Sequence, residues 1–172
     1  QRSSARAKRL SQFFPIPVKD TSALFCLIIE IERGGNMTEK ELCATAIKAM
    51  DNAYVPYSGY KVGAALLTAD GKIFTGCNIE NAAYSPTVCA ERVAFFKAIS
   101  SGERKFKAIA VAGGKDGKIE GAFPPCGVCR QVMAEFCSPD FAILVVTGTD
   151  SYKKYSLSDL LPEAFTPKNI DK

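Results

Sequence analysis

Two cysteine-containing segments restrict the possible folds of this chain more than any other feature. They are Cys89–Arg92, with the sequence CAER, and Pro125–Cys129, with the sequence PCGVC. Each stands where the hydrophobic spacing predicts that a helix begins. Cys126 and Cys129 are three residues apart and therefore face the same way on a helix. If both share one metal ion with Cys89, the fold must bring the starts of two helices together.

The chain contains no histidine, which restricts the chemistry open to these cysteines. Ser-His-Asp and Cys-His catalysis, histidine-ligated metals and histidine general bases are all excluded. Unpaired N–H groups at a helix start favour thiolate over thiol. Thiolates from Cys89, Cys126 and Cys129 would surround one Zn²⁺ and leave the fourth tetrahedral position to water. Three protein ligands plus water is the pattern of a catalytic zinc.

Two charged residues, Glu91 and Arg92, lie just beyond Cys89. A carboxylate at position 91 can take a proton from the metal's water and pass it on. Arg92 lies three residues after Cys89 on the same helix face, so it can donate to the thiolates and offset their negative charge. Each residue also has an ordinary explanation. An acid is favoured at any helix N-terminus, and an arginine is typical of a solvated surface.

The cysteine pattern leaves alternatives open. A C-x-x-C pair by itself is typical of a redox pair, of half a structural zinc site or of two core cysteines, and Cys77 or Cys137 could close the metal site as a fourth ligand. The joint pattern favours the catalytic site, because neither rival gives Cys89–Arg92 a role. Seven cysteines, an odd and irregular set, favour reduced thiols in an intracellular protein. We interpret the other four as small buried hydrophobes: Cys26, Cys43, Cys77 and Cys137.

Helices and strands alternate along the chain. Hydrophobic periodicity predicts helices over 38–53, 89–100, 127–137 and, briefly, 156–161. It predicts strands over 62–67, 72–77, 106–112 and 141–147, the first two joined as a hairpin through Ala69-Asp70-Gly71. Strands connected through helices should be parallel, so the sheet is mixed. This order predicts an α/β fold, a three-layer α/β/α sandwich.

The folded domain is expected to span residues 37–172. Met37 is followed by Thr38-Glu39-Lys40-Glu41, a capping box that opens a helix. Residues 1–36 are a leader or extension of unknown role, whose Arg- and Ser-rich start has features of an organellar transit peptide. They carry six Lys or Arg and three acids, so the rest of the chain holds only +1 of the net charge of +4. A near-neutral domain without a basic stripe argues against nucleic-acid binding. No apolar run approaches the roughly 18 residues that span a bilayer, so no membrane partner is expected.

The motifs also carry a resemblance that covers residues 38–166. This part of the chain resembles the small homotetrameric zinc-dependent cytidine deaminases in five stretches: Val55–Leu67, Gly76–Ser85, Thr87–Arg92, Pro125–Gln131 and Leu160–Phe165. All-cysteine zinc sites occur among the nucleobase deaminases. The resemblance implies a mixed sheet of about five strands, one Zn²⁺ per subunit and a homotetramer. It also implies hydrolysis of cytidine and 2′-deoxycytidine to uridine and 2′-deoxyuridine plus ammonia, in which zinc-bound hydroxide attacks C4 and Glu91 shuttles protons.

The resemblance further implies substrate contacts. Asn78 and Glu80 would hold the ribose 3′-hydroxyl, and the backbone around Ala90 would contact the base edge. Tyr60 would pack against the base, where most members of the family carry phenylalanine; its flat, apolar ring face keeps that contact possible. The remaining two contacts would involve neighbouring subunits: Phe165 would reach into a partner's site, and Tyr84 would lie near a shared wall. The alternatives are ordinary loop polar residues at 78 and 80 and core aromatics at 60 and 165.

Three rival functions remain at this point. Another aminopyrimidine, such as blasticidin S or free cytosine, could be the substrate, although the ribose-binding pair Asn78 and Glu80 disfavours free cytosine. A carboxylate at the sugar end disfavours a nucleotide, since no Lys/Arg cluster lies in the motifs to bind its phosphate. The other rivals are a structural-zinc interaction module and a thiol-redox protein that uses Cys126 and Cys129. The expected location is the cytoplasm or another reducing compartment, with organellar targeting by residues 1–36 left open.

Overall fold

The computed structural model describes residues 37–119 and 121–170, so the predicted leader, 1–36, lies outside the described residues. Five strands form one sheet: β1 (Tyr60–Thr68), β2 (Ile73–Cys77), β3 (Phe106–Lys115), β4 (Ala142–Gly148) and β5 (Ser151–Ser156). The α-helices are α3 (Glu39–Ala49), α4 (Ala90–Ser100), α5 (Gly127–Phe136) and α6 (Leu157–Leu160). Two 3-10 turns complete the described elements, η1 (Met50–Asn52) and η2 (Pro167–Asn169).

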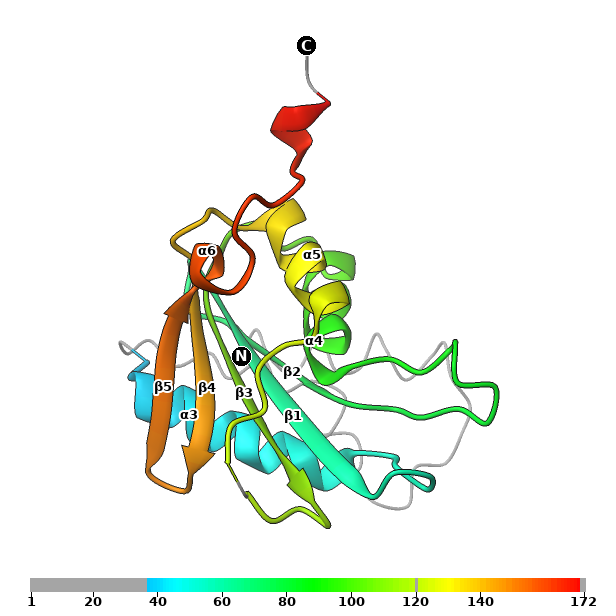
Figure 1. The fold of residues 1–172 in the computed structure, drawn as a ribbon. Coiled ribbons are helices and arrows are strands. Elements are labelled where there is room, and N and C mark those ends of the chain that lie inside the picture. The colour runs from blue at the N-terminus through cyan, green and yellow to red at the C-terminus, as the bar shows by residue number, and fades with distance from the viewer. Residues whose placement is uncertain (1–36, 120, 171–172) are drawn as a thin grey trace, which may run out of the picture.

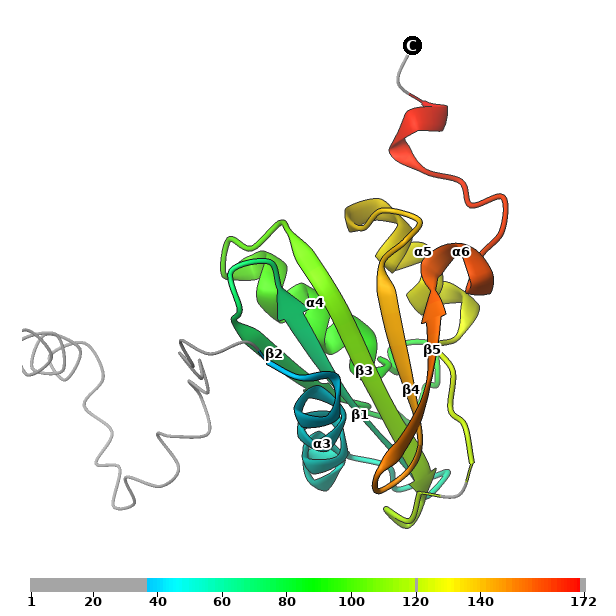
Figure 2. The ribbon, with the colours of Figure 1, turned by 90° about the vertical axis from the view of Figure 1, so that its left-hand side faces the viewer.

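The sheet is mixed, as predicted, with the strand order β2-β1-β3-β4-β5. β1 runs antiparallel to both β2 and β3, and β4 runs antiparallel to β5. β3 and β4 are the parallel pair, and the chain crosses between them through α5. Figures 1 and 2 show α3 on one face of the sheet and α4 with α5 on the other. The predicted α/β/α sandwich around a five-stranded mixed sheet is therefore confirmed.

Two apolar clusters hold the three layers together. Alternate residues of β1 point to opposite faces, so Ala64 and Leu66 pack toward α4 and α5, whereas Ala65 and Leu67 pack toward α3. On the first face, the fully buried ring of Phe95 contacts three other phenylalanines, with centroid distances of 5.1, 6.4 and 6.2 Å to Phe106, Phe136 and Phe141. β3 and β4 are buried on both faces, which explains their continuous apolar sequences.

The structure differs most from the predicted elements at three places, and the other bounds shift by at most two residues. The α-helix predicted over 38–53 ends at Ala49 and continues as η1, although its predicted capping box, Thr38 with Glu41, is present. β3 extends through two glycines of the predicted loop to Lys115. Ser151–Ser156 was not predicted as a strand, because its sequence is polar and lies at the sheet edge, where only one side needs to be buried.

The start of α4 is seated against the sheet by a glycine. A Cβ placed on Gly76 in β2 would lie 2.2 Å from the carbonyl oxygen of Ala90 and 2.6 Å from the amide nitrogen of Ala94. A side chain at position 76 would therefore push the first turns of α4 away from β2. This close approach places Cys89 and Glu91 against the sheet.

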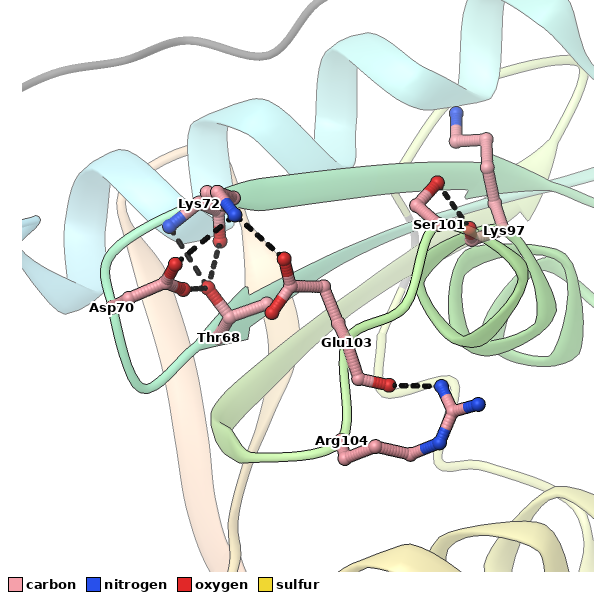
Figure 3. A network of polar contacts seen from close by, with 7 residues as sticks. All are labelled: Thr68, Asp70, Lys72, Lys97, Ser101, Glu103 and Arg104. Atoms are coloured by element: carbon pink, nitrogen blue, oxygen red, sulfur yellow. Dashed lines mark hydrogen bonds and ion pairs between the residues drawn. The ribbon is translucent and has the colours of Figure 1, made fainter.

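The opposite end of α4 is held by a polar network, shown in Figure 3. Lys72 in the β1–β2 hairpin lies 2.7 Å from Glu103, just after α4, and 3.1 Å from Asp70. The Thr68 hydroxyl donates to Asp70 and accepts from the Lys72 amide. The amide of Ala69 also donates to the Lys105 carbonyl at 2.9 Å. The hairpin is thus tied to the segment that links α4 to β3. None of the described helices is long and apolar enough to cross a membrane.

Candidate active site

The three predicted metal ligands lie at the N-terminal ends of two helices. Cys89 is the N-cap of α4, Cys126 is the N-cap of α5, and Cys129 lies in the first turn of α5. Neither N-cap cysteine uses its side chain to cap its own helix. Both thiols are therefore available to a shared centre, and the helix starts surround it with unpaired N–H groups that favour thiolates.

The geometry of the cluster fits a zinc ion. The Sγ atom of Cys126 lies 3.8 Å from that of Cys89 and 3.6 Å from that of Cys129, and all three sulfurs lie within 4.8 Å of one another. A tetrahedral zinc with Zn–S bonds of about 2.3 Å requires sulfurs about 3.8 Å apart. Within the described residues the cluster has three members, and Cys77 and Cys137 do not belong to it. The described structure therefore offers three thiols that could hold one metal ion.

Electrostatics at the cluster favour a negative charge on Cys89. A hydrogen bond from the Cys129 thiol, assisted by Arg92 and Cys126, lowers the pKa of Cys89 to about 5. The same contact and burial raise the pKa of Cys129. Arg92 donates from Nη2 to the Cys89 sulfur at 3.8 Å and to the Thr87 carbonyl at 3.1 Å. Arg92 thus lies where the sequence predicts it, beside the thiolates.

Glu91 is buried next to the cluster. Its side chain is only 4% exposed and lines the same cavity as Cys89 and Cys126. Burial raises the pKa of Glu91 to about 7. A carboxylate with a pKa in this range both accepts and returns a proton near neutral pH, which is what a proton shuttle requires.

The cavity beside the cluster has a volume of about 190 Å³. One part of its wall carries polar and reactive groups: Asn78, Glu80, Thr87, Cys89, Glu91 and Cys126. The other part is apolar and comes from the sheet and the two loops that face it: Val62, Val88, Val111, Phe123 and Pro124. A mostly apolar cavity with a few convergent polar groups is typical of a small-molecule site.

Asn78 and Glu80 both line the cavity and also hold its walls in place. The Asn78 side chain accepts from the Val62 amide and donates to the Tyr60 carbonyl, each at 2.8 Å. One oxygen of Glu80 accepts from the amides of Tyr57, at 2.9 Å, and Ser58, at 3.2 Å. Hydrogen bonds from Ser58 and Tyr57 lower the pKa of Glu80. A carboxylate held ionised in this way remains an acceptor for hydroxyl groups.

Four predicted substrate contacts do not line the cavity within this single chain. Ala90 is fully buried, and Tyr60 is 43% exposed at the outer end of β1, packed on Phe123. Tyr84 is 75% exposed and lies near Tyr57, with ring centroids 6.2 Å apart. Phe165 is 62% exposed, and its carbonyl accepts a hydrogen bond of 2.8 Å from the Gln131 side chain of α5. The contacts expected of these residues stay predictions.

Six lining residues were not predicted from the sequence: Val62, Thr87, Val88, Val111, Phe123 and Pro124. Two sequence signals could have found part of this set. Thr87 and Val88 directly precede the CAER segment, and Phe123 and Pro124 directly precede the PCGVC segment. Residues close to a metal ligand are candidates to line the same cavity, so these positions were open to prediction, although Ala90 and Val128, which are equally close, do not line it. Val111 gave no signal, because only the strand register places it there.

Comparison with known proteins identifies the family. The family model described as the cytidine and deoxycytidylate deaminase zinc-binding region matches residues 37–145. The chain belongs to this deaminase family. A cytidine deaminase of Sporosarcina psychrophila is 48% identical over 134 residues, which cover 78% of this chain and 96% of that protein. A probable cytidine deaminase of Dictyostelium discoideum is 43% identical over 136 residues, covering 78% and 89% of the two chains.

Solved structures of the deaminase family share the fold. The cytidine deaminase of Burkholderia pseudomallei superposes with a TM-score of 0.69 at 46% identity, covering 75% of this chain and all of that chain (100%). The cytidine deaminase of Mycobacterium tuberculosis gives a TM-score of 0.65 at 38% identity, with coverages of 76% and 98%. The predicted family and its zinc-binding region are therefore confirmed, and the cluster of Cys89, Cys126 and Cys129 is the group that could hold the metal.

Proposed function

We propose that this chain is a zinc-dependent cytidine deaminase, which hydrolyses cytidine and 2′-deoxycytidine to uridine and 2′-deoxyuridine with release of ammonia. The observation that carries the proposal is the cluster of three cysteines, two of which line one cavity together with the buried Glu91. A structural zinc module has no use for a buried acid in a cavity, and a redox pair has no use for a third thiol. The names of the relatives support the same reaction.

Glu91 performs the proton transfers of this reaction. Cys89, Cys126 and Cys129 would hold the zinc, whose positive charge would lower the pKa of a water molecule in the cavity. Glu91 accepts a proton from this water while the oxygen of the water bonds to C4 of the base. Glu91 gives that proton to ring N3. Glu91 then takes the remaining proton from the oxygen on C4 and delivers it to the amine, which leaves as ammonia when the C4–N bond breaks. Because burial raises the pKa of Glu91 to about 7, both directions of transfer are accessible near neutral pH.

The sugar end of the cavity favours a nucleoside. Two backbone amides hold one oxygen of Glu80, and a ribose hydroxyl can donate to the acceptor sites that remain. Asn78 fixes the start of β1 and keeps one amide N–H for the same hydroxyl. The ionised carboxylate of Glu80 repels a phosphate, so cytidine is preferred to its nucleotide. The same repulsion disfavours nucleic-acid substrates.

The protein acts as a homotetramer in a reducing compartment such as the cytoplasm, in pyrimidine salvage. Two observations support shared sites: the Phe165 side chain is exposed, and Tyr84 is exposed in the β2–α4 loop that also carries Asn78 and Glu80. Each would complete a site formed with a neighbouring subunit. The six described cysteines are free thiols, which supports a reducing location. Organellar targeting by residues 1–36 is compatible with this proposal.

A direct assay tests the proposed function. Purified, zinc-loaded protein is incubated with cytidine, cytosine and blasticidin S, and loss of the aminopyrimidine absorbance is followed for each. Rapid conversion of cytidine is expected, with cytosine turned over poorly because it lacks the ribose that Glu80 and Asn78 would hold. Faster conversion of blasticidin S would assign another aminopyrimidine, and zinc binding without turnover of any of the three would identify a structural metal. Sedimentation of the same sample tests the tetramer, and an active monomer would contradict it.

A further inference from the structure

The apolar wall of the cavity contains one aromatic ring, and it is not the predicted one. Phe123 lines the cavity, whereas Tyr60 does not and is 43% exposed at the start of β1. The two rings are packed with centroids 5.9 Å apart and planes inclined by 39°. The ammonium group of Lys115 lies 5.8 Å from the centroid of the Tyr60 ring. Tyr60 is thus held between Phe123 and a cation.

Phe123 is held in this position because Gly113, in β3, has no side chain. Gly113 in β3 pairs with Val62 in β1, so both residues face the cavity side of the sheet. A Cβ placed on Gly113 would lie 2.8 Å from Cγ of Phe123 and 3.0 Å from its Cβ and Cδ1. The Phe123 ring therefore occupies the space that a side chain at position 113 would need. The sheet has a glycine where the ring rests on it.

We propose that Phe123 is a substrate-contacting residue, which adds an aromatic wall against which the pyrimidine base packs, and that Gly113 is a positioning residue that fixes its ring. This inference rests on the proposed function, because it requires a flat base in the cavity. The cavity offers a base two kinds of surface, the reactive groups around Glu91 on one part of the wall and Phe123 with valines on the other. A base that presents its amino carbon to the reactive part must meet the apolar part with another edge or face.

The proposed contact with the base explains why the Phe123 ring packs on both Gly113 and Tyr60. A loop phenylalanine without a function has no need of a glycine seat and an aromatic support, since half-buried rings pack well on ordinary side chains. A ring that must meet a ligand has to be fixed before the ligand arrives, because mobility would weaken binding. Contact between a base and an aromatic ring changes affinity by about 5- to 100-fold when the ring is removed.

The test compares two matched phenylalanine substitutions. Phe123→Leu removes the ring in the cavity, whereas Phe106→Leu removes a half-buried ring that packs on Phe95 at the other end of β3. For Phe123→Leu we expect the KM for cytidine and the Kd for uridine, measured by calorimetry, to rise about tenfold with kcat nearly unchanged, as loss of uniform binding requires. For Phe106→Leu we expect a lower unfolding midpoint with unchanged KM and Kd.

A double-mutant cycle tests whether Gly113 positions the Phe123 ring. Gly113→Ala displaces the Phe123 ring and is expected to raise the KM and the uridine Kd. In a Phe123→Ala background the ring is gone, so adding Gly113→Ala should change neither value by more than about twofold. If the wild type binds and converts cytidine but Phe123→Leu leaves KM and Kd unchanged, the inference fails and the proposed function stands. If the wild type neither binds uridine nor converts cytidine, the proposed function itself fails. Additive effects of Gly113→Ala and Phe123→Ala would exclude Gly113 as the seat of that ring.

Discussion

The two ends of α4 are built in opposite ways. At its N-terminal end, Cys89 and Glu91 place a thiolate and a buried carboxylate within one cavity, next to two more thiols. At the other end, Lys72 contacts Asp70 and Glu103, so opposite charges are paired at a partly exposed surface. The N-terminal end gathers several acidic groups beside one cation, Arg92, whereas at the C-terminal end a lysine is paired with two carboxylates.

The comparison separates groups that serve chemistry from groups that serve the fold. Negative groups crowded together and withdrawn from water destabilise the folded state unless a cation joins them. A zinc ion held by Cys89, Cys126 and Cys129 would supply such a cation at the N-terminal end of α4, in addition to Arg92. The C-terminal end has all its partners in the chain. Changes at the first end should alter metal content and turnover, and changes at the second should alter stability only.

Removal of one zinc ligand should have the largest effect. Cys129→Ala deletes a thiolate that is 1% exposed, so the variant should lose zinc, lose all measurable deamination and unfold at a lower temperature. Zinc content, turnover of cytidine and the unfolding midpoint are measured on the same sample.

Cys137→Ala is the matched control for this change. Cys137 is also a free thiol, at the C-terminal end of the same helix, and burial raises its pKa to about 12. It lies outside the cluster, so the variant should keep one zinc per subunit and its activity. Loss of zinc from Cys137→Ala would show that Cys137 closes the site, and the open-site mechanism would then be wrong.

Substitution of the buried carboxylate should affect turnover alone. Glu91→Gln keeps the shape of the side chain but removes its ability to move protons, so kcat should fall by about 10²- to 10⁴-fold. Zinc content should remain at the wild-type level, since Glu91 is not a member of the thiol cluster. Because the variant also removes a buried acid whose pKa is raised, its unfolding midpoint should not decrease. Turnover within tenfold of the wild type would exclude Glu91 as the proton shuttle.

The sequence predicts these two ends of α4 unequally. The cluster and Glu91 could be predicted, because metal ligands are few, chemically distinct and placed at helix starts by local spacing. The network at the other end could not, since Lys72 and Glu103 are 31 residues apart and ordinary in type. Only the hairpin register and the path of the chain after α4 bring them together. Local patterns predict chemistry well and distant surface pairing poorly.

The same distinction applies to the fold and the cavity walls. The helices and the four apolar strands follow from hydrophobic periodicity, whereas the polar edge strand β5 does not. Asn78 and Glu80 were found by resemblance and do line the cavity. Phe123 was not found, because its place depends on a missing side chain at Gly113 on another element. The position of Phe123 just before the PCGVC segment was its one local signal, and its contact with Gly113 leaves no such signal.

Substitution of Arg92 should affect zinc binding and turnover less than substitution of Cys129, but more than substitution of Lys72. Its Nη2 atom donates to the Cys89 sulfur, so Arg92→Gln removes the positive charge that offsets the thiolates. Zinc affinity should weaken by about 10- to 100-fold, as is usual for partners of metal ligands. Competition with a chromophoric chelator measures the affinity, and excess zinc should restore most of the activity. An unchanged affinity would make Arg92 a purely structural contact to the Thr87 carbonyl.

The smallest effect is expected at the far end of α4. Lys72→Met breaks the contacts to Asp70 and Glu103, and partly exposed ion pairs contribute little, so the unfolding midpoint should fall by only about 1–4 °C. Zinc content, KM and kcat should stay at wild-type values. Lys105→Met, an exposed lysine two residues after Glu103, is the control and should not shift the midpoint.

Unfolding midpoints measured at acid pH show whether Lys72 stabilises the protein through its ion pairs or through the packing of its side chain. Hydrogen bonds from Thr68 and Lys72 lower the pKa of Asp70, so its stabilising contribution is present above the unfolded pKa of about 3.9 and is lost as the pH falls through the lower folded value. The difference in midpoint between wild type and Lys72→Met should therefore persist at pH 7, shrink below about pH 4 and decrease in 1 M salt. A difference that is independent of pH and salt would mean that the Lys72 stem packs the hairpin, and any change in kcat would mean that the two ends of α4 are coupled.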